Sequence, residues 1–229
     1  MTIGIMQPYF MPYLGYWQLM AAVDKYVVYD DVNFIKRGWA NRNNILVNGE
    51  PYLFSISLNG ASQNKSFNEI DIADDFGRLK KTLYHSYNKA PYYEETMHLM
   101  NEIFDYPDRN LARFIHHSFQ KVLKYVKCNT ELIMSSSIEK DCSLKGQDKI
   151  LDICRILQTD KYINTINGRE LYNVDDFAKK GIELRFIKMS SITYPQYRNA
   201  FVPNLSLIDV LMFNGREGTK QLLNAYVLE

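Results

Sequence analysis

The chain opens with Met1-Thr-Ile-Gly-Ile-Met-Gln7-Pro8, and the fold prediction starts from these residues and those that follow them up to Tyr29. Residues 2–6 form a short apolar run, which predicts a buried strand that stops at the proline, because proline has no N–H group to donate to a sheet. Residues 16–24 repeat apolar side chains at helical spacing, and residues 25–29 are rich in valine and tyrosine, which indicates a second buried strand. A strand, a helix and a strand in so short a segment predict a parallel βαβ unit.

A β-hairpin is expected next. Residues 44–47 and 52–58 flank Asn48-Gly49, which is the strongest hairpin signal in the sequence. The two strands are expected either to join the main sheet or to form a flap beside it. Further strands are expected at 132–134, 162–166 and 184–187, and further helices at 148–157, 174–180, 207–213 and 218–227.

Residues 74–126 carry apolar side chains at helical spacing, and breaks at Ala90-Pro91 and Tyr106-Pro107 divide them into three predicted helices. Strands and helices alternate again in the second half of the chain, which is typical of the α/β class. We therefore predict a single domain over residues 1–229, with a mostly parallel, Rossmann-like sheet, a β-hairpin and a helical insertion at about 74–126.

The composition excludes several classes of protein. The 229 residues are 46% hydrophobic and 23% charged, which rules out disorder and collagen-like repeats. Lys and Arg total 27 against 26 for Asp and Glu, so the net charge makes nucleic-acid binding unlikely as a function. The three cysteines form no CxxC pair, so neither a disulfide framework nor a zinc site is indicated. Because no signal peptide and no long apolar segment is visible, we expect a cytoplasmic protein without a membrane segment.

Polar and aromatic side chains follow the first predicted strand. Open parallel sheets bind ligands in a crevice at the carboxyl ends of their strands, so Gln7, Tyr13 and Tyr16 are candidate substrate-binding residues. The alternative is that this proline-rich segment is only a rigid loop packed on the sheet. No glycine-rich phosphate-binding motif is present.

The densest group of charged and carboxamide side chains lies in residues 29–43, directly after the second strand. Carboxylates act as bases, and Lys and Arg bind phosphate, Arg with two hydrogen bonds at once. Asp30 and Asp31 are therefore candidate catalytic residues. The candidate substrate-binding residues of this segment are Asn33, Lys36, Arg37, Asn41 and Arg42. A solvated loop with local ion pairs is the alternative interpretation.

Histidines offer one further catalytic candidate. His85 lies with Lys89 at the end of a predicted helix, next to several tyrosines that can stack on a base or a sugar ring. His85 is a candidate catalytic residue and Lys89 a candidate substrate-binding residue, although a histidine in such a place is often a hydrogen-bonded structural group. His116-His117 cannot share one metal ion, because adjacent side chains on a helix point in different directions, and no metal site is predicted.

The last candidates precede the helix expected at 207–213. Gln196 and Tyr197 are predicted to bind substrate, since they follow a strand and would lie at the same sheet edge as the earlier candidates if all strands are parallel. Ser206 and Asp209 stand at the N-cap and N3 positions of that helix, which resembles a capping box and would give both residues a structural role.

These segments together resemble the WbqC-like protein family over nearly the whole chain. The matching residues are Ile5 to Tyr16, Tyr29 to Asn43, Tyr87 to Tyr92, Gly168 to Tyr172, Gly181 to Leu184 and Phe201 to Asp209. One departure is Asn33, where the family commonly has glutamine. The first segments also resemble the start of the nucleotidylyltransferase-type α/β fold, but Pro12-Tyr-Leu-Gly-Tyr16 stands in place of its His-x-Gly-His motif, which counts against adenylate chemistry.

The resemblance implies a role in making cell-surface polysaccharides of the O-antigen type, for which a glycine transferase activity has been proposed in the family. It implies an enzyme that transfers an amino acid or another acyl group to a nucleotide-linked amino sugar. The alternative is a protein of the same pathway that binds a nucleotide sugar without catalysis. The implied partners are a nucleotide sugar and an acyl donor, ATP with magnesium is a candidate cofactor, and the aromatic content leaves material for a homodimer interface.

Overall fold

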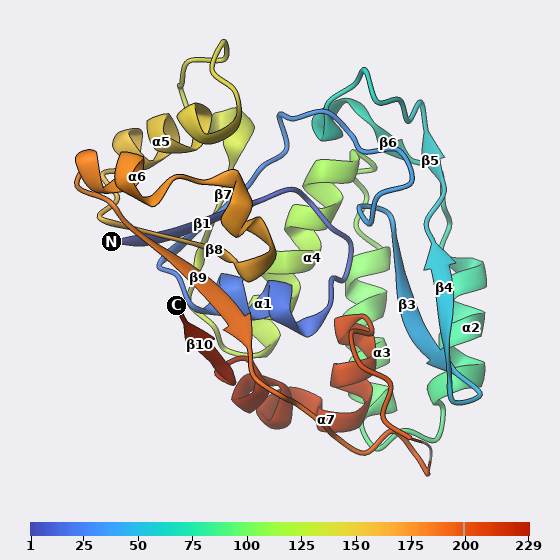
Figure 1. Cartoon of the computed structure of the whole chain (residues 1–229). Helices are drawn as coiled ribbons and strands as arrows, with labels where there is room; N and C mark the ends of the chain where they lie inside the picture. Colours follow the sequence, from blue (N-terminus) through green and yellow to red (C-terminus); the bar gives the residue numbers. More distant parts are fainter. Residues whose placement is uncertain (199) are drawn as a thin grey trace.

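A six-stranded sheet forms the centre of the computed structural model, which describes residues 1–198 and 200–229 (Figure 1). The strands are β1 (Thr2–Met6), β2 (Lys25–Val28), β7 (Glu131–Met134), β8 (Lys161–Thr165), β9 (Glu183–Met189) and β10 (Tyr226–Leu228). Their order across the sheet is β10-β9-β8-β1-β2-β7. All neighbours pair in parallel except β10, which runs antiparallel to β9.

The order of the strands reverses at β1. The chain moves from β1 to β2 and β7 on one side, then returns to place β8, β9 and β10 on the other. This is the order of Rossmann-like folds, in which ligands bind outside the carboxyl ends of the strands at the point of reversal. The predicted fold class is therefore confirmed. A ligand-binding site is expected at the loops after β1 and β8.

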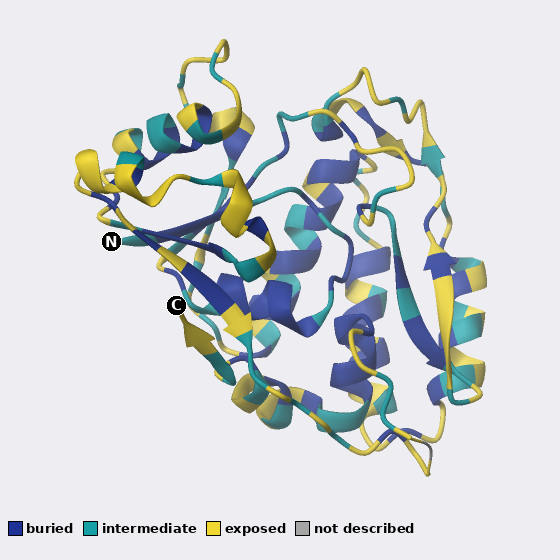
Figure 2. Cartoon of the chain, in the orientation of Figure 1, coloured by how far each residue is buried: buried dark blue, intermediate teal, exposed yellow. Residues whose placement is uncertain are grey.

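Helices cover both faces of the sheet. On one face, α5 (Gly146–Ile156) and α6 (Val174–Lys179) pack with Ile3 and Ile5 of β1. On the other face lie α1 (Leu14–Ala21), α4 (Leu111–Tyr125) and α7 (Leu207–Leu222), which pack with Tyr26 and Val28 of β2. The central strands β1 and β2 are accordingly mostly buried, and the outer surfaces of α5 and α6 are exposed (Figure 2). The described helices are all too short or too polar to span a lipid bilayer.

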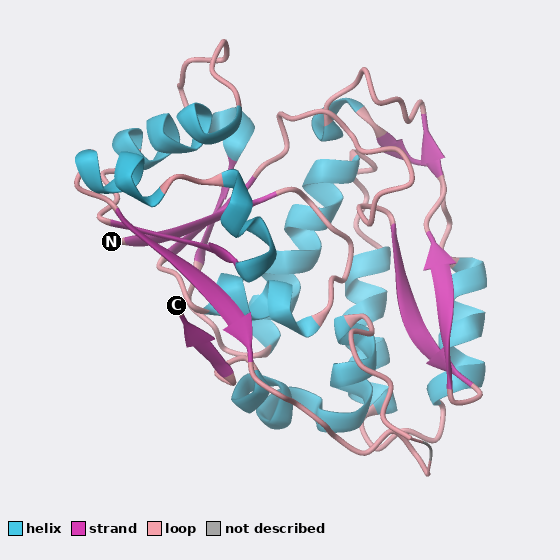
Figure 3. Ribbon diagram, in the orientation of Figure 1, coloured by secondary structure: helices cyan, strands magenta, loops and turns pink. Residues whose placement is uncertain are grey.

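The hairpin forms a separate small sheet beside the main one (Figure 3). It consists of β3 (Arg42–Val47) and β4 (Glu50–Ser55), joined by Asn48 and Gly49, whose φ angles are +53° and +83°. Positive φ at both central residues is the requirement of the tight turn that the sequence predicts. A second short pair, β5 (Leu58–Asn59) with β6 (Asp71–Ile72), was not expected from the sequence.

The three helices of the insertion are confirmed as α2 (Gly77–Tyr87), α3 (Tyr93–Phe104) and α4. The prediction of a helix over 218–227 is wrong in its second half. Helix α7 continues to Leu222, and residues 226–228 form the edge strand β10, because pairing with β9 decides the structure of a segment too short for periodicity to classify.

The packing between the insertion and the main sheet can be tested by a substitution at Phe114 of α4. Its fully buried ring stacks on Phe76 at a centroid distance of 5.2 Å and contacts Phe10, from the loop after β1, at 5.6 Å. We expect Phe114→Ala to lower the free energy of unfolding by about 4 kcal/mol, measured by urea denaturation. Leu171→Ala, at a side chain that is 71% exposed, is the control and should change it by less than about 0.5 kcal/mol. Equal effects of the two substitutions would contradict this view of the core.

Candidate functional site

A pocket of about 390 Å³ lies at the carboxyl ends of β1 and β8, where the strand order reverses. Its walls come from the loop after β1, the start of β3 with the loop before it, the helical turn η3 (Ile166–Leu171) after β8, and the loop before α7. The lining residues are Tyr9, Tyr13, Trp39, Asn43, Asn44, Asn167 and Asn204. A larger hollow of about 470 Å³ beside α5 includes Thr159 and Ile182, which precede β8 and β9, and so lies at the opposite edge of the sheet.

Two tyrosines, Tyr9 and Tyr13, line this pocket. Burial, and to a smaller extent the neighbouring Tyr13, raises the pKa of Tyr9. Burial also raises the pKa of Tyr13. Both hydroxyls therefore stay protonated at neutral pH. Among the described residues no hydrogen-bond partner holds either hydroxyl, so both are available as donors to a ligand.

Trp39 supplies an open aromatic face. Its side chain is 50% exposed, its ring centroid lies 6.4 Å from that of Tyr9, and the Arg42 guanidinium lies 5.6 Å from the ring. The Nε of Arg42 donates to the Gly38 carbonyl at 2.7 Å, which fixes the guanidinium beside the ring and leaves the two terminal nitrogens for an anionic group. A Cβ on Gly38 would lie 2.9 Å from the Ile35 carbonyl oxygen, so this tight loop requires glycine.

The side chains around the pocket are suited to contacts with flat rings and with hydroxyl groups. Aromatic faces stack on sugar rings and nucleobases, and carboxamide groups donate and accept hydrogen bonds with hydroxyl groups and base edges. Among the described residues, no group of three or more His, Cys, Asp or Glu side chains is arranged to hold a metal ion.

Of the predicted site residues nearest the pocket, some line it and others hold the surrounding loops in place. Tyr13 lines the pocket, and Arg42 lies beside it against Trp39. The hydroxyl of Tyr16 is buried and donates to the Gln7 carbonyl at 2.6 Å, so this pair supports the loop from behind. Asn41 donates from its side chain to the Ile56 carbonyl at 2.8 Å. The remaining candidates of the segment, Asn33, Lys36 and Arg37, are exposed.

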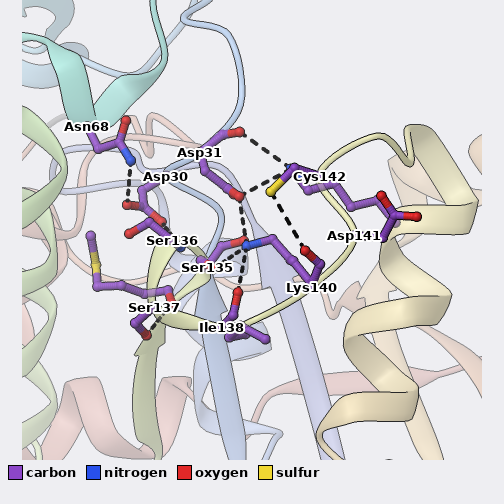
Figure 4. A network of polar contacts seen from close by, with 12 residues as sticks. Asp30, Asp31, Asn68, Ser135, Ser136, Ser137, Ile138, Lys140, Asp141 and Cys142 are labelled. Atoms are coloured by element: carbon purple, nitrogen blue, oxygen red, sulfur yellow. Dashed lines mark hydrogen bonds and ion pairs between the residues drawn. The ribbon is translucent and has the colours of Figure 1, made fainter.

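Asp30 has its carboxylate occupied by the protein itself (Figure 4). The side chain is fully buried, and its two oxygens accept from the Ser136 backbone N–H at 2.9 Å and from the Asn68 side chain at 3.3 Å. Asp30 therefore ties the end of β2 to the turn after β7 and to the 3-10 turn η1 (Phe67–Glu69). It is not among the described residues that line the pocket.

Asp31 forms a buried ion pair with two lysines that are distant in sequence. Its Oδ2 lies 2.8 Å from Lys140 Nζ and 3.2 Å from Lys149 Nζ, and these lysine side chains are only 2% and 9% exposed. Burial alone would raise the pKa of Asp31, but the hydrogen bond from Lys140 and the charges of the two lysines lower it below its ordinary value. The carboxylate is thus held in its ionised form by its partners, which makes it a weak base.

His85, Lys89 and Tyr197 meet at a different place. They line a hollow of about 310 Å³ near the tip of the hairpin, together with Asn48 and Gly49. The Tyr197 hydroxyl donates to the Ser86 carbonyl at 2.9 Å, which joins the loop before α7 to the end of α2. The structure thus brings these three candidates together, but not with Tyr13 and Arg42.

Gln196 belongs to a buried network around Asp209. Its side-chain nitrogen donates to Asp209 at 2.7 Å, and its oxygen accepts from the Val202 backbone N–H at 2.6 Å. Tyr87 and Tyr194 each donate a hydroxyl to Asp209 at 2.8 Å. Burial raises the pKa of Asp209, although these three hydrogen bonds act against that rise.

The capping-box prediction is correct only for Ser206. Its hydroxyl accepts from the Ile208 backbone N–H at 3.3 Å and so caps α7. Asp209 does not return a hydrogen bond to the N-cap residue, because its carboxylate points into the network just described.

A protein-family model matches most of the chain. The sequence model of the WbqC-like protein family matches residues 7–221, a range that contains the whole lining of the pocket. The chain belongs to the WbqC-like protein family. The uncharacterized protein Rv1507c of Mycobacterium tuberculosis is 22% identical to this WbqC-like chain over 225 residues, which is 96% of each of the two. No solved structure gives a significant match.

Reasoning from the sequence missed several residues of the site in this WbqC-like chain. Tyr9, Trp39 and Asn43 lie in segments that were singled out, but other residues of those segments were chosen as candidates instead. Asn167 follows the strand predicted at 162–166, and the rule that ligands bind beyond strand ends would have found it. No sequence pattern marks Lys140 and Lys149 as partners of Asp31, because only folding brings them close to it.

Replacing Asp31 by asparagine (Asp31→Asn) leaves two buried lysines without their counter-charge, and we expect the free energy of unfolding at pH 7 to fall by about 3 kcal/mol. A carboxyl group whose pKa is lowered by folding stabilises the protein above its unfolded-state pKa, and this stabilisation is lost as the pH falls through the folded-state value. The difference between wild type and variant should therefore shrink below about pH 4, measured by urea denaturation at several pH values.

Glu139→Gln is the matched control for this prediction, because it makes the same chemical change at an exposed residue next to Lys140. It should change stability by less than about 0.5 kcal/mol. A loss in Asp31→Asn that is the same at every pH would show that the ion pair is not the cause.

Proposed function

We propose that this WbqC-like protein is a cytoplasmic enzyme of cell-surface polysaccharide biosynthesis. Its substrate is a nucleotide-linked amino sugar, which binds in the pocket at the carboxyl edge of the sheet, and the reaction transfers an amino acid or another acyl group to the amine of that sugar. The observation that carries the proposal is the pocket itself, with its open Trp39 face, the free Tyr9 and Tyr13 hydroxyls and Arg42 beside them.

Each part of such a substrate has a counterpart in the pocket. The ring of Trp39 is suited to stack on the base or the sugar. Arg42 is suited to the diphosphate, because a guanidinium binds phosphate oxygens with two hydrogen bonds and is already held in place by Gly38. The tyrosine hydroxyls and the asparagine carboxamides can bind the sugar hydroxyl groups.

The transfer forms a bond from the amine nitrogen to the acyl carbonyl carbon and breaks the bond from that carbon to the leaving group of the donor. The electron pair of the broken bond goes to the leaving group, and the amine loses a proton. Asp30 and Asp31, expected from the sequence to take this proton, are occupied by Ser136, Asn68 and the two lysines. The proposal therefore gives the pocket residues the work of binding and orientation, and the proton goes to the leaving group or to water.

A second candidate function is binding of the nucleotide sugar without catalysis. The observation in its favour is that the described lining of the pocket consists of tyrosine, tryptophan and asparagine, with no carboxylate, histidine, cysteine or lysine. The two candidates share the ligand and differ only in whether a new bond is formed, so they are separated by looking for product.

Binding of the proposed ligand can be followed through the two tryptophans of the chain, because Trp17 is fully buried and Trp39 is half exposed. We expect UDP- or dTDP-linked amino sugars to change the fluorescence of the wild-type protein, and Trp39→Ala to weaken binding about tenfold in calorimetric titration. Trp39→Phe keeps an aromatic face and should retain most of the affinity. Tyr84→Ala removes an exposed aromatic ring on α2 and should have no effect. Wild-type affinity in Trp39→Ala would contradict the assignment of the pocket.

Product formation decides between the two candidate functions. The purified protein is incubated with an amino-sugar nucleotide that binds, together with acyl-coenzyme A, or with an amino acid, ATP and magnesium. Mass spectrometry should find the nucleotide sugar heavier by one acyl group. Arg42→Ala should reduce this product at least tenfold, because it removes the group proposed to hold the diphosphate. Tight binding with no product from any donor would favour the non-catalytic function.

A further inference from the structure

A small apolar cavity adjoins the polar pocket. Its volume is about 30 Å³, and it lies between the start of α1, the end of β9 and the start of α7. The apolar side chains that matter most here are Met189, Ile192, Phe201 and Val210. We call this cavity the apolar slot.

The apolar slot and the polar pocket share a wall. Tyr13 and Asn204 line both, so a molecule bound in the polar pocket lies next to the slot. A substrate with a hydroxyl-rich part and a short apolar part would find a matching surface for each on the two sides of these residues.

The walls of the slot are fixed by hydrogen bonds to buried partners. Tyr13 pairs with Ser206 in an isolated antiparallel bridge, and the Leu207 backbone N–H donates to the Pro12 carbonyl at 3.0 Å. The Tyr194 hydroxyl donates to the buried carboxylate of Asp209, and its ring packs edge to face on Phe201 at a centroid distance of 5.0 Å. Because these contacts pin the slot on two sides, its size acts as a limit on what it can contain.

Water is a poor occupant of this slot. A volume of about 30 Å³ has room for roughly two water molecules, but a bound water needs two to four polar partners, and apart from Tyr13, Tyr194 and Asn204 the lining side chains are apolar. An alkyl group of one or two carbons would instead gain the free energy of leaving water.

We propose that the apolar slot receives the alkyl part of the transferred acyl group and limits that group to about three carbons. This inference rests on the proposed function and names its donor class, an activated short-chain acyl group as a thioester or an acyl phosphate. In the transfer, the amine nitrogen bonds to the acyl carbon, the bond from that carbon to sulfur or phosphate oxygen breaks, and the electron pair and one proton leave with the thiol or phosphate. The alkyl part stays in the slot throughout, so the slot also binds the N-acylated product.

The test uses product-type ligands, so it needs no knowledge of the donor. The amino-sugar nucleotide of highest affinity among the UDP- and dTDP-linked compounds is prepared with a free amine and with N-acetyl, N-propanoyl and N-hexanoyl groups. Dissociation constants are measured by calorimetry on the whole protein. Each methylene group that enters the slot should tighten binding about fourfold, and the hexanoyl compound should bind at least tenfold more weakly than the propanoyl compound.

Two substitutions at Val210 change the size of the slot in opposite directions. Val210→Ala enlarges it and should tighten binding of the hexanoyl compound, whereas Val210→Ile fills it and should remove the gain in affinity that acylation gives over the free amine. Val227→Ala makes the first change at an exposed valine and should leave the series as in wild type. Met189→Ala is the second enlarging variant if Val210→Ala unfolds below the assay temperature.

The outcomes separate this inference from the proposed function. If the free amine binds but chain length has no effect in wild type and in the enlarged variants, the slot has no role and the proposed function stands. If no amino-sugar nucleotide binds, both are overturned. A shift of the preferred chain length in Val210→Ala or Met189→Ala, and not in Val227→Ala, supports the slot as the acyl subsite.

Discussion

The carbonyl oxygen of Met11 joins three segments that are far apart in the sequence, and the pocket depends on it. It accepts from the Asn43 side chain at 2.6 Å and from the Ser206 hydroxyl at 2.7 Å, and all three residues are buried. Met11 has a φ of +46°, a conformation that few residues other than glycine adopt unless their surroundings hold it. Because a buried carbonyl without a partner is costly, these two hydrogen bonds fix the loop after β1 against β3 and α7. Tyr9, Tyr13, Asn43 and Asn204 thereby take up their places around one space.

The sheet decides where this space lies, and the hairpin closes it. Reversal of the strand order at β1 leaves the loops after β1 and β8 diverging to opposite sides, which creates a crevice between them. In this protein β3 stands across that crevice, held by the Ser206 backbone N–H, which donates to the Asn44 carbonyl at 2.8 Å. The insertion supports the arrangement from behind, where Phe114 of α4 packs on Phe10. Segments that add no strand to the main sheet thus supply one wall of the pocket and its support.

Local sequence patterns predict most of the secondary structure. The arrangement of the candidate site is determined mostly by contacts between residues that are distant in sequence. The turn at Asn48-Gly49 and the helices of the insertion follow from turn chemistry and periodicity, which act over a few residues. Strand β10 forms by pairing with β9, and residues 226–228 are too few for their sequence pattern to classify them. Lys140 and Lys149 reach Asp31 across more than a hundred residues of sequence, so the pairing that turns Asp31 into a structural group is invisible until the chain is folded.

Burial also explains why the charged residues that stand out in the sequence are not those around the pocket. A charge at the end of a buried strand is tolerated only if it is paired or hydrogen-bonded, so Asp30 and Asp31 are taken up by the fold itself. Neutral aromatic and carboxamide groups carry a smaller penalty and can face an open pocket without partners. A site built from such groups acts by holding molecules in place. For an amine and an already activated acyl donor that is a large effect, because orientation alone is worth effective concentrations of about 10⁵ M or more. In the proposed transfer the activation would then come with the donor, and the size and polarity of the space beside Tyr13 would matter more than the acidity of any side chain around it.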